Sequence, residues 1–388
     1  FFTQKPAYEI RLSLVGSEMC IRDRLKTVFT RLQLTELSER TIAVVGTNGK
    51  TSTSKFIHRL LKKNNRSSLT FTSPHLVEYT ERIKSDKNLN LQDNLDFVKD
   101  LEEKNKIVLG YFEALFLLAC KSFLESEYDY YICEAGIGGK LDTTSIIQSK
   151  NVVLTNIGKD HQDLLGYTDQ EVLDQKIFIS KNIENLFVGD INSELINIIK
   201  NNYPHSKVKY FLRDTVETLN MNLKDLMANQ KNFLLALSTV SSLLNVDILN
   251  ESISLNFEEI EGRFEIVNQN PVKIIDGAHN VDGVKHLFKD YERQYDFQQT
   301  DIFIGFKKGI DIESIISFIN SQSKYRIYFI EEQTFYDQEN PVVYLDYFQK
   351  AKFEYEVVSL DAFSSNKNPS ILLGSLYLIG EFKKRKLV

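Results

Sequence analysis

Cysteine is scarce in this chain: only three of its 388 residues are cysteines, at positions 20, 120 and 133. None of them stands at the short spacing of a paired cysteine metal site, and so few thiols give no disulfide framework. Cys120 and Cys133 lie in apolar stretches, which predicts buried thiols. This usage fits a protein of the reducing cytoplasm.

Long hydrophobic runs are missing as well. No stretch approaches the roughly 18 apolar residues that a membrane helix needs, and the front of the sequence shows no signal-peptide pattern. The net charge is −6, which gives no electrostatic reason to expect a nucleic acid or an anionic membrane as a partner. We interpret the basic ending, residues 383–386, as a solvated helix tail.

What is present is the composition of a globular protein, with 42% hydrophobic and 26% charged residues. A chain of 388 residues is too long for one ordinary core and suits two or three domains. Residues 8–24 resemble the conceptual translation of sequencing-adapter DNA, so we exclude residues 1–24 from the fold. We expect a central domain over residues 25–261 and a smaller domain over 262–388.

Short buried strands alternate with helical patterns along most of the chain, which predicts an α/β fold with parallel sheets. In the first region we expect strands at 41–46, 69–72, 128–133 and 152–155, and helices at 51–63, 94–104, 110–126 and 233–244. In the second we expect strands at 273–275, 301–306, 325–330 and 371–373. Ligands gather at the carboxyl ends of such strands, so the chemistry should lie in the loops that follow them.

A phosphate-binding loop is predicted at Gly46-Thr47-Asn48-Gly49-Lys50-Thr51, which follows a strand and opens a helix. The backbone N–H groups of such a loop cradle an anion, and Lys50 would neutralise the β- and γ-phosphates of ATP. A hydroxyl of Thr51 or Ser52 would reach Mg²⁺. The two glycines stand closer together than in the usual P-loop, and an ordinary glycine-rich turn is the alternative.

This loop and several later segments, taken in order, resemble the Mur ligase family, and in particular its folylpolyglutamate synthase and dihydrofolate synthase branch. The other segments are Thr72-Ser-Pro-His-Leu76 with Glu81-Arg-Ile83, Glu134-Ala-Gly-Ile-Gly-Gly-Lys-Leu-Asp142, Thr155-Asn-Ile-Gly-Lys-Asp-His161, Gly262-Arg-Phe-Glu265, Asp276-Gly-Ala-His-Asn280 and Gly374-Ser-Leu-Tyr-Leu378. The resemblance spans about residues 41–388 and implies a Mur-ligase-like P-loop domain followed by a smaller Rossmann-like domain.

The resemblance also implies an activity. A member of this branch uses ATP and Mg²⁺ to phosphorylate a folate carboxylate, and the amine of L-glutamate attacks the acyl phosphate. Dihydropteroate is a further possible substrate. The nucleotide would lie between the two domains, and we expect a monomer. Phosphoryl transfer is mostly a matter of positioning and charge neutralisation, so it needs basic, metal-binding and phosphate-binding groups together.

The candidate residues follow from position and from the resemblance. Glu134 comes just after a strand, where a carboxylate is well placed to hold Mg²⁺, and Asn232 shares a helix face with Asn229. The expected catalytic residues are Lys50, Glu134, His161 and Lys176. The expected nucleotide-binding residues are Gly46, Thr47, Asn48, Gly49, Lys50, Thr51, Ser52, Asn232, Arg263, Asp276 and His279. The expected metal ligands are Ser52, Ser73, Glu134 and His161, and His75 and Arg82 are the expected substrate contacts.

The sequence departs from the family pattern at several places. The folate branch usually has Gly-Lys-Gly-Ser where this chain has Gly49-Lys50-Thr51-Ser52, and the family histidine before the Asn229 pair is Ala228 here. Lys176 matches the lysine that relatives carbamylate, but its flanks differ, which leaves its modification open. Arg82 could equally be a structural ion-pair partner of Glu81 or Asp86.

Two alternatives remain at this stage. A cell-wall Mur-type ligase acting on a UDP-sugar peptide would use the same phosphate chemistry, but such enzymes usually carry an extra N-terminal domain, for which the residues before the phosphate loop leave little room. A non-catalytic nucleotide-binding protein is the other. Loss of Lys50, Glu134 or His161 would have favoured it, and all three are present.

Overall fold

The computed structural model describes residues 25, 28–87, 89, 95–105, 108–203, 207–246, 259–296, 299–322, 324–331, 334–335, 337–340 and 355–386. The adapter-like residues 1–24 and Cys20 lie outside this part. Contacts divide the chain into two units: residues 1–73 with 80–255, and residues 74–79 with 256–388. Our predicted boundary at 261/262 stays a prediction, because residues 247–258 are not described.

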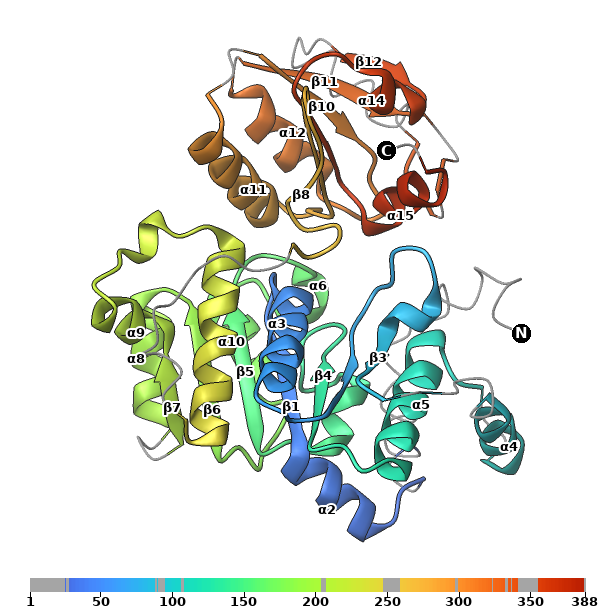
Figure 1. The fold of residues 1–388 in the computed structure, drawn as a ribbon, viewed down its shortest axis with the longest axis vertical. Coiled ribbons are helices and arrows are strands. Elements are labelled where there is room, and N and C mark those ends of the chain that lie inside the picture. The colour runs from blue at the N-terminus through green and yellow to red at the C-terminus, as the bar shows by residue number, and fades with distance from the viewer. Residues whose placement is uncertain are drawn as a thin grey trace. The chain divides into compact units, whose positions relative to one another are not determined.

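The first unit is built on a sheet in the order β3-β2-β4-β1-β5-β6-β7 (Figure 1). All neighbouring pairs are parallel except β2 and β3. The strands are β1 (Thr41–Val45), β2 (Ser68–Phe71), β3 (Ile83–Ser85), β4 (Tyr130–Glu134), β5 (Asn151–Asn156), β6 (Asn185–Asp190) and β7 (Val208–Phe211).

Helices cover this sheet, and α3 and α10 lie side by side on it (Figure 1). The α-helices are α2 (Arg31–Arg40), α3 (Lys50–Lys63), α4 (Leu95–Asn105), α5 (Tyr111–Glu125), α6 (Gln162–Leu165), α7 (Asp169–Ile177), α8 (Ser193–Asn202), α9 (Leu212–Thr218) and α10 (Ala228–Leu244). The 3₁₀ helices are η3 (Tyr79–Arg82), η4 (Thr143–Ile147) and η5 (Leu223–Asp225). The fully buried strand β1 lies between β4 and β5, so the loops after these three strands emerge together.

The second unit is a smaller sheet in the order β12-β11-β10-β13-β9-β8, parallel except for the pair β8 and β9. Its strands are β8 (Glu265–Gln269), β9 (Val272–Asp276), β10 (Thr300–Ile304), β11 (Tyr325–Ile330), β12 (Tyr355–Val358) and β13 (Ser370–Leu373). Its helices are α11 (Val281–Gln294), α12 (Ile312–Asn320), α14 (Asp361–Ser365) and α15 (Leu376–Lys384).

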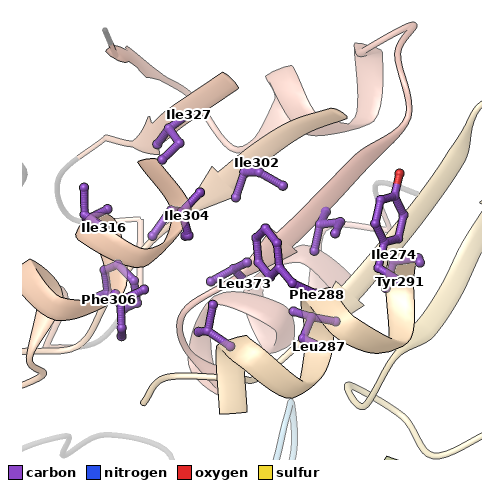
Figure 2. Close-up of a cluster of buried hydrophobic side chains, with 14 of the residues drawn as sticks. Ile274, Leu287, Phe288, Tyr291, Ile302, Ile304, Phe306, Ile316, Ile327 and Leu373 are labelled. Carbon is purple, nitrogen blue, oxygen red and sulfur yellow. The ribbon is translucent and has the colours of Figure 1, made fainter. Parts of the chain in front are cut away.

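Alternate residues of these strands face two separate cores. On one face Ile274, Ile302 and Leu373 pack with Phe288 of α11 and with α12, as Figure 2 shows. On the other face Ile275 and its neighbours pack against α14 and α15. A sheet buried on both faces is what continuous apolar strands predict, and the predicted two α/β sheets are confirmed.

Among the described residues, no helix combines the length and the apolar character that crossing a bilayer requires. The thiols of Cys120 and Cys133 are fully buried, as predicted. Burial raises the pKa of the Cys133 thiol well above its usual value.

Candidate nucleotide and metal site

The predicted phosphate loop joins β1 to α3. Gly49 precedes the helix in a left-handed conformation, with φ at 82°, which glycine adopts without strain. The Nζ of Lys50 donates to the carbonyl oxygens of Gly46 and Thr47 at 3.0 and 3.1 Å. The ammonium group therefore lies against the loop, next to the N-terminus of α3, where an anion would be favoured.

Two residues at the end of β5 hold this loop in place. Asn156 accepts hydrogen bonds from the N–H of Thr47 at 3.1 Å and of Asn48 at 2.8 Å. The hydroxyl of Thr155 donates to the carbonyl oxygen of Asn48 at 2.6 Å. Neither Thr155 nor Asn156 was among the expected site residues. Their polar character at the end of a buried strand beside β1 was the available signal.

Glu134 is the last residue of β4, whereas we expected it to be the first residue after the strand. It is only 2% exposed. The hydroxyl of Thr51 donates to both of its carboxylate oxygens at 3.0 Å, and the N–H of Ser73 donates to Oε2 at 3.2 Å. The hydroxyl that contacts Glu134 is thus that of Thr51, whereas Ser52 is buried in the first turn of α3. Two segments, one from the start of α3 and one after β2, thus converge on the carboxylate of Glu134.

Lys176 lies beside the phosphate loop. Its side chain comes from α7, where it shares the buried face with Val172 and Leu173, and its Nζ donates to the carbonyl oxygen of Gly46 at 3.0 Å. Burial, with the nearby charge of Lys50, lowers the pKa of Lys176 to about 7. The amine is therefore largely uncharged at mildly alkaline pH.

His161 precedes α6 in a left-handed conformation with φ at 47°. Its side chain is 43% exposed, and Nε2 lies 3.7 Å from Oδ1 of Asp160. The structure thus places His161 on the loop after β5, and its assignment as a metal ligand stays a prediction.

Asp142 braces the glycine-rich segment that follows Glu134. Its carboxylate accepts from the N–H groups of Gly136 at 2.9 Å, Ile137 at 3.0 Å and Thr144 at 2.9 Å. Burial raises the pKa of this carboxyl group, and the hydrogen bonds oppose that rise. Asp142, the last residue of the Glu134–Asp142 segment, thus has a positioning role that the sequence did not predict.

Asn232 of α10 lies against the phosphate loop. A Cβ placed on Gly49 would lie 2.5 Å from the Oδ1 of Asn232, so the glycine makes room for this amide. The neighbouring Lys231 forms an ion pair with Asp190 at 2.7 Å, which ties α10 to the end of β6. The structure thus places Asn232 beside the phosphate loop, and its assignment as a nucleotide-binding residue stays a prediction.

Three predicted nucleotide residues lie together in the second unit. Asp276 ends β9 and accepts from the N–H groups of Phe264 and Ala278, each at 2.7 Å. Burial raises the pKa of Asp276 while Arg263 opposes the rise. The Nδ1 of His279 lies 2.8 Å from the carbonyl oxygen of Gly277. Asp276 and His279 lie on the turn that precedes α11, and Arg263, which precedes β8, lies beside this turn, because a Cβ placed on Gly277 would lie 2.4 Å from its guanidinium nitrogen.

The two predicted substrate contacts lie in different units. Arg82 is only 3% exposed, and its guanidinium lies 5.0 Å above the ring of Tyr111. His75 belongs to the 74–79 segment that groups with the second unit. Within the described residues no group of three or more His, Cys, Asp and Glu side chains is arranged to hold a metal.

The comparisons with known proteins bear on this arrangement. A profile of the Mur ligase middle domain matches residues 44–268. The chain is 30% identical to the dihydrofolate synthase/folylpolyglutamate synthase of Buchnera aphidicola (subspecies Schizaphis graminum), over 78% of this chain and 76% of that protein. The chain belongs to the dihydrofolate synthase/folylpolyglutamate synthase group of the Mur ligase family.

Solved structures show the same fold. Escherichia coli FolC in complex with ADP matches with a TM-score of 0.74 and 21% identity, over 97% of this chain and 98% of that one. The bifunctional enzyme of Yersinia pestis complexed with AMPPNP and a manganese ion matches with a TM-score of 0.70 and 20% identity, over 99% and 100%. The predicted family and the Mur-ligase-like fold class are confirmed.

In this Mur ligase, the buried amine of Lys176 should make stability depend on pH. Its pKa in the folded state lies below the value of about 10.4 in an unfolded chain. Between pH 7 and 10 the unfolded chain therefore binds the extra proton, so the free energy of unfolding rises with pH, and the full penalty applies below pH 7. Between pH 8 and 9.5, we expect the free energy of unfolding of wild type to rise relative to that of Lys176→Met by about 1 kcal/mol per pH unit.

Urea unfolding at fixed salt, without metal or nucleotide, measures this difference. The exposed Lys181 offers a matched control, because Lys181→Met removes a lysine that is not buried. Its difference from wild type should not change with pH. A constant difference for Lys176→Met would show that the amine is not desolvated as described.

Proposed function

We propose that this chain is an ATP-dependent ligase that adds L-glutamate to a reduced folate, with dihydropteroate as a second carboxylate substrate. The observation that carries the proposal is the convergence of Thr51 and Ser73 on the buried Glu134, next to the Gly46–Lys50 loop. Together these groups offer a phosphate cradle and a hard oxygen donor set. Relatives of this group are named for folate ligation, which supports the choice of substrate.

The chain's own residues have distinct tasks in such a reaction. Amide formation begins when the carboxylate of the folate attacks the γ-phosphorus of ATP, which gives an acyl phosphate and ADP. The phosphate loop and Lys50 would hold the β- and γ-phosphates and offset their charge. The amine of glutamate then attacks the acyl carbon and releases inorganic phosphate. Arg263, Asp276 and His279 are proposed as further nucleotide-binding residues.

A divalent metal fits the oxygen groups around Glu134. A carboxylate and a hydroxyl are hard ligands of the kind that Mg²⁺ or Mn²⁺ prefers, and Mg²⁺ commonly completes its shell with water and phosphate oxygens. We propose Glu134, Ser73 and His161 as the residues that hold Mg²⁺, with Thr51 or Ser52 beside them. When bound, the metal would offset the charge that develops on the transferred phosphoryl group.

Lys176 is proposed to support this site. Its pKa, lowered to about 7, leaves a large share of the amine uncharged at neutral and mildly alkaline pH, and the uncharged amine is the form that adds CO₂. This property supports carbamylation of Lys176, as the family resemblance implies. We also propose a monomer, and the scarcity of cysteine supports the cytoplasm as its compartment.

Incorporation of labelled glutamate tests the proposal. With Mg-ATP, we expect the label to enter tetrahydrofolate or dihydropteroate, and ADP to be released only when both glutamate and the folate are present. ADP release with a UDP-sugar peptide instead would replace the folate proposal with the cell-wall one. Nucleotide binding without ADP release for any acceptor would favour a non-catalytic protein.

A further inference from the structure

The segment Pro74–Tyr79, here called the strap, leaves the first unit directly after Ser73 and returns to it at Thr80. A hydrogen bond from the N–H of Thr72 to the carbonyl oxygen of Arg82, at 2.8 Å, closes its base. Its contacts nevertheless group it with the second unit. The strap is therefore a short part of the second unit whose two flanking residues, Ser73 and Thr80, belong to the first.

The strap is anchored at a glycine inside a helix. Gly380 is buried in α15, and a Cβ placed on it would lie 1.8 Å from the carbonyl oxygen of Leu76 and 2.7 Å from its carbonyl carbon. Glycine in a helix interior is less favourable than alanine by about 1 kcal/mol. The close approach of the Leu76 backbone explains why this position lacks a side chain.

The side chain of Leu76 supplies a second anchor. It packs on the core that α15 shares with β9 and β13. It also meets Gly262, because a Cβ placed there would lie 3.3 Å from both the Leu76 and the Leu376 Cδ2 atoms. The last family segment, which includes Leu376, thus gains a role that the proposed reaction had not assigned: its helix holds the strap.

The other end of the strap lies at the proposed metal site. Ser73 is one peptide bond from Pro74, and its N–H donates to Oε2 of Glu134 at 3.2 Å. Only three residue steps, about 10 Å of extended chain, separate Ser73 from Leu76. Proline fixes φ at position 74, which removes slack from this connection.

We propose that Gly380 is a positioning residue for the metal site: by admitting the Leu76 backbone it anchors the strap and so holds Ser73 against Glu134. The inference rests on the proposed function, because it takes Glu134 and Ser73 as the metal-binding groups. Mg²⁺ and similar ions demand near-ideal geometry, with ligands at 2.0–2.1 Å for Mg²⁺. A displacement of the strap by a fraction of an ångström would therefore weaken metal binding.

Gly380→Ala tests the anchor, and Lys384→Ala on the exposed side of the same helix is the matched control. Binding of Mn²⁺ to the protein with ADP, followed by electron paramagnetic resonance, is the first readout. We expect Gly380→Ala to weaken Mn²⁺ binding about five- to tenfold and Lys384→Ala to leave it unchanged. Hydrogen exchange of peptides covering residues 72–82 is the second readout, and it should become faster only in Gly380→Ala.

Leu76→Ala keeps the test open if Gly380→Ala does not fold, because it removes an anchor without creating a clash. We expect it to weaken Mn²⁺ binding two- to threefold and to speed exchange in the strap. Wild-type Mn²⁺ affinity in the folded Gly380→Ala protein overturns the inference. If Glu134→Ala also binds Mn²⁺ like wild type, the metal site itself is misassigned and the proposed function fails instead.

Discussion

Replacing Lys50 with alanine should reduce ADP release more than a hundredfold while leaving the fold intact. The ammonium group of Lys50 lies over the carbonyl oxygens of Gly46 and Thr47, at the N-terminus of α3. In that position it supplies the nearest full positive charge of the loop to a bound phosphate. A hundredfold loss corresponds to about 2.7 kcal/mol of transition-state stabilisation, which is within the range for losing one charged contact to a transferring phosphoryl group.

Coupled-enzyme detection of ADP, with both substrates saturating, measures this effect. Lys63→Ala removes an exposed lysine from the other end of the same helix and should keep wild-type rates. Circular dichroism and the melting temperature report on folding. Near-wild-type turnover in a folded Lys50→Ala protein would show that this loop does not serve phosphoryl transfer.

Much of the fold around Lys50 could be predicted from the sequence because its signals are local. The run Thr41–Val45 is entirely buried, and a buried apolar run before a glycine-rich turn is typical of a central parallel strand. The same reasoning located β4 and β5. It also located Glu134 to within one residue, since a polar residue after such a strand must lie at the carboxyl edge of the sheet.

The antiparallel edge strands escaped the sequence analysis for a physical reason. Strand β3 is only three residues long, too short to show a period, and β8 is half exposed, so neither carries an apolar pattern. The left-handed backbone conformation of His161 could not be predicted either. Residues other than glycine rarely adopt this conformation unless the surrounding structure imposes it. Only the assembled structure reveals these features.

Contacts between residues far apart in the chain could not be predicted from the sequence either. The hydroxyl of Thr51 and the N–H of Ser73 reach Glu134 only because β1, β2 and β4 are neighbours in the sheet. The burial of Lys176 did leave a signal, since it stands three and four residues after the buried Leu173 and Val172. Its lowered pKa comes first from burial and then from the nearby charge of Lys50, and no local pattern shows the second cause.

Glu134→Ala should raise the Mg²⁺ concentration needed for half-maximal activity and lower the rate well over tenfold, a barrier change of at least about 1.4 kcal/mol. His161→Ala should act in the same direction. The carboxylate of Glu134 is 2% exposed and accepts hydrogen bonds from Thr51 and Ser73. A cation bound at this position would offset the charge of a buried carboxylate.

Glu134→Gln separates the loss of charge from the loss of volume. The amide nearly preserves the shape of the side chain but removes the charge that attracts a cation. We therefore expect the rise in melting temperature on adding Mg²⁺ and ADP to disappear largely in Glu134→Gln, because ligand binding stabilises only the state that binds it. Glu127→Gln, at an exposed position before β4, should keep the full rise. Two results together would contradict the assignment of Glu134 to the metal site. They are a rise in the melting temperature of Glu134→Gln as large as that of wild type and an unchanged Mg²⁺ titration of activity. The role left for the carboxylate would be structural, as the hydrogen-bond acceptor for Thr51 and Ser73.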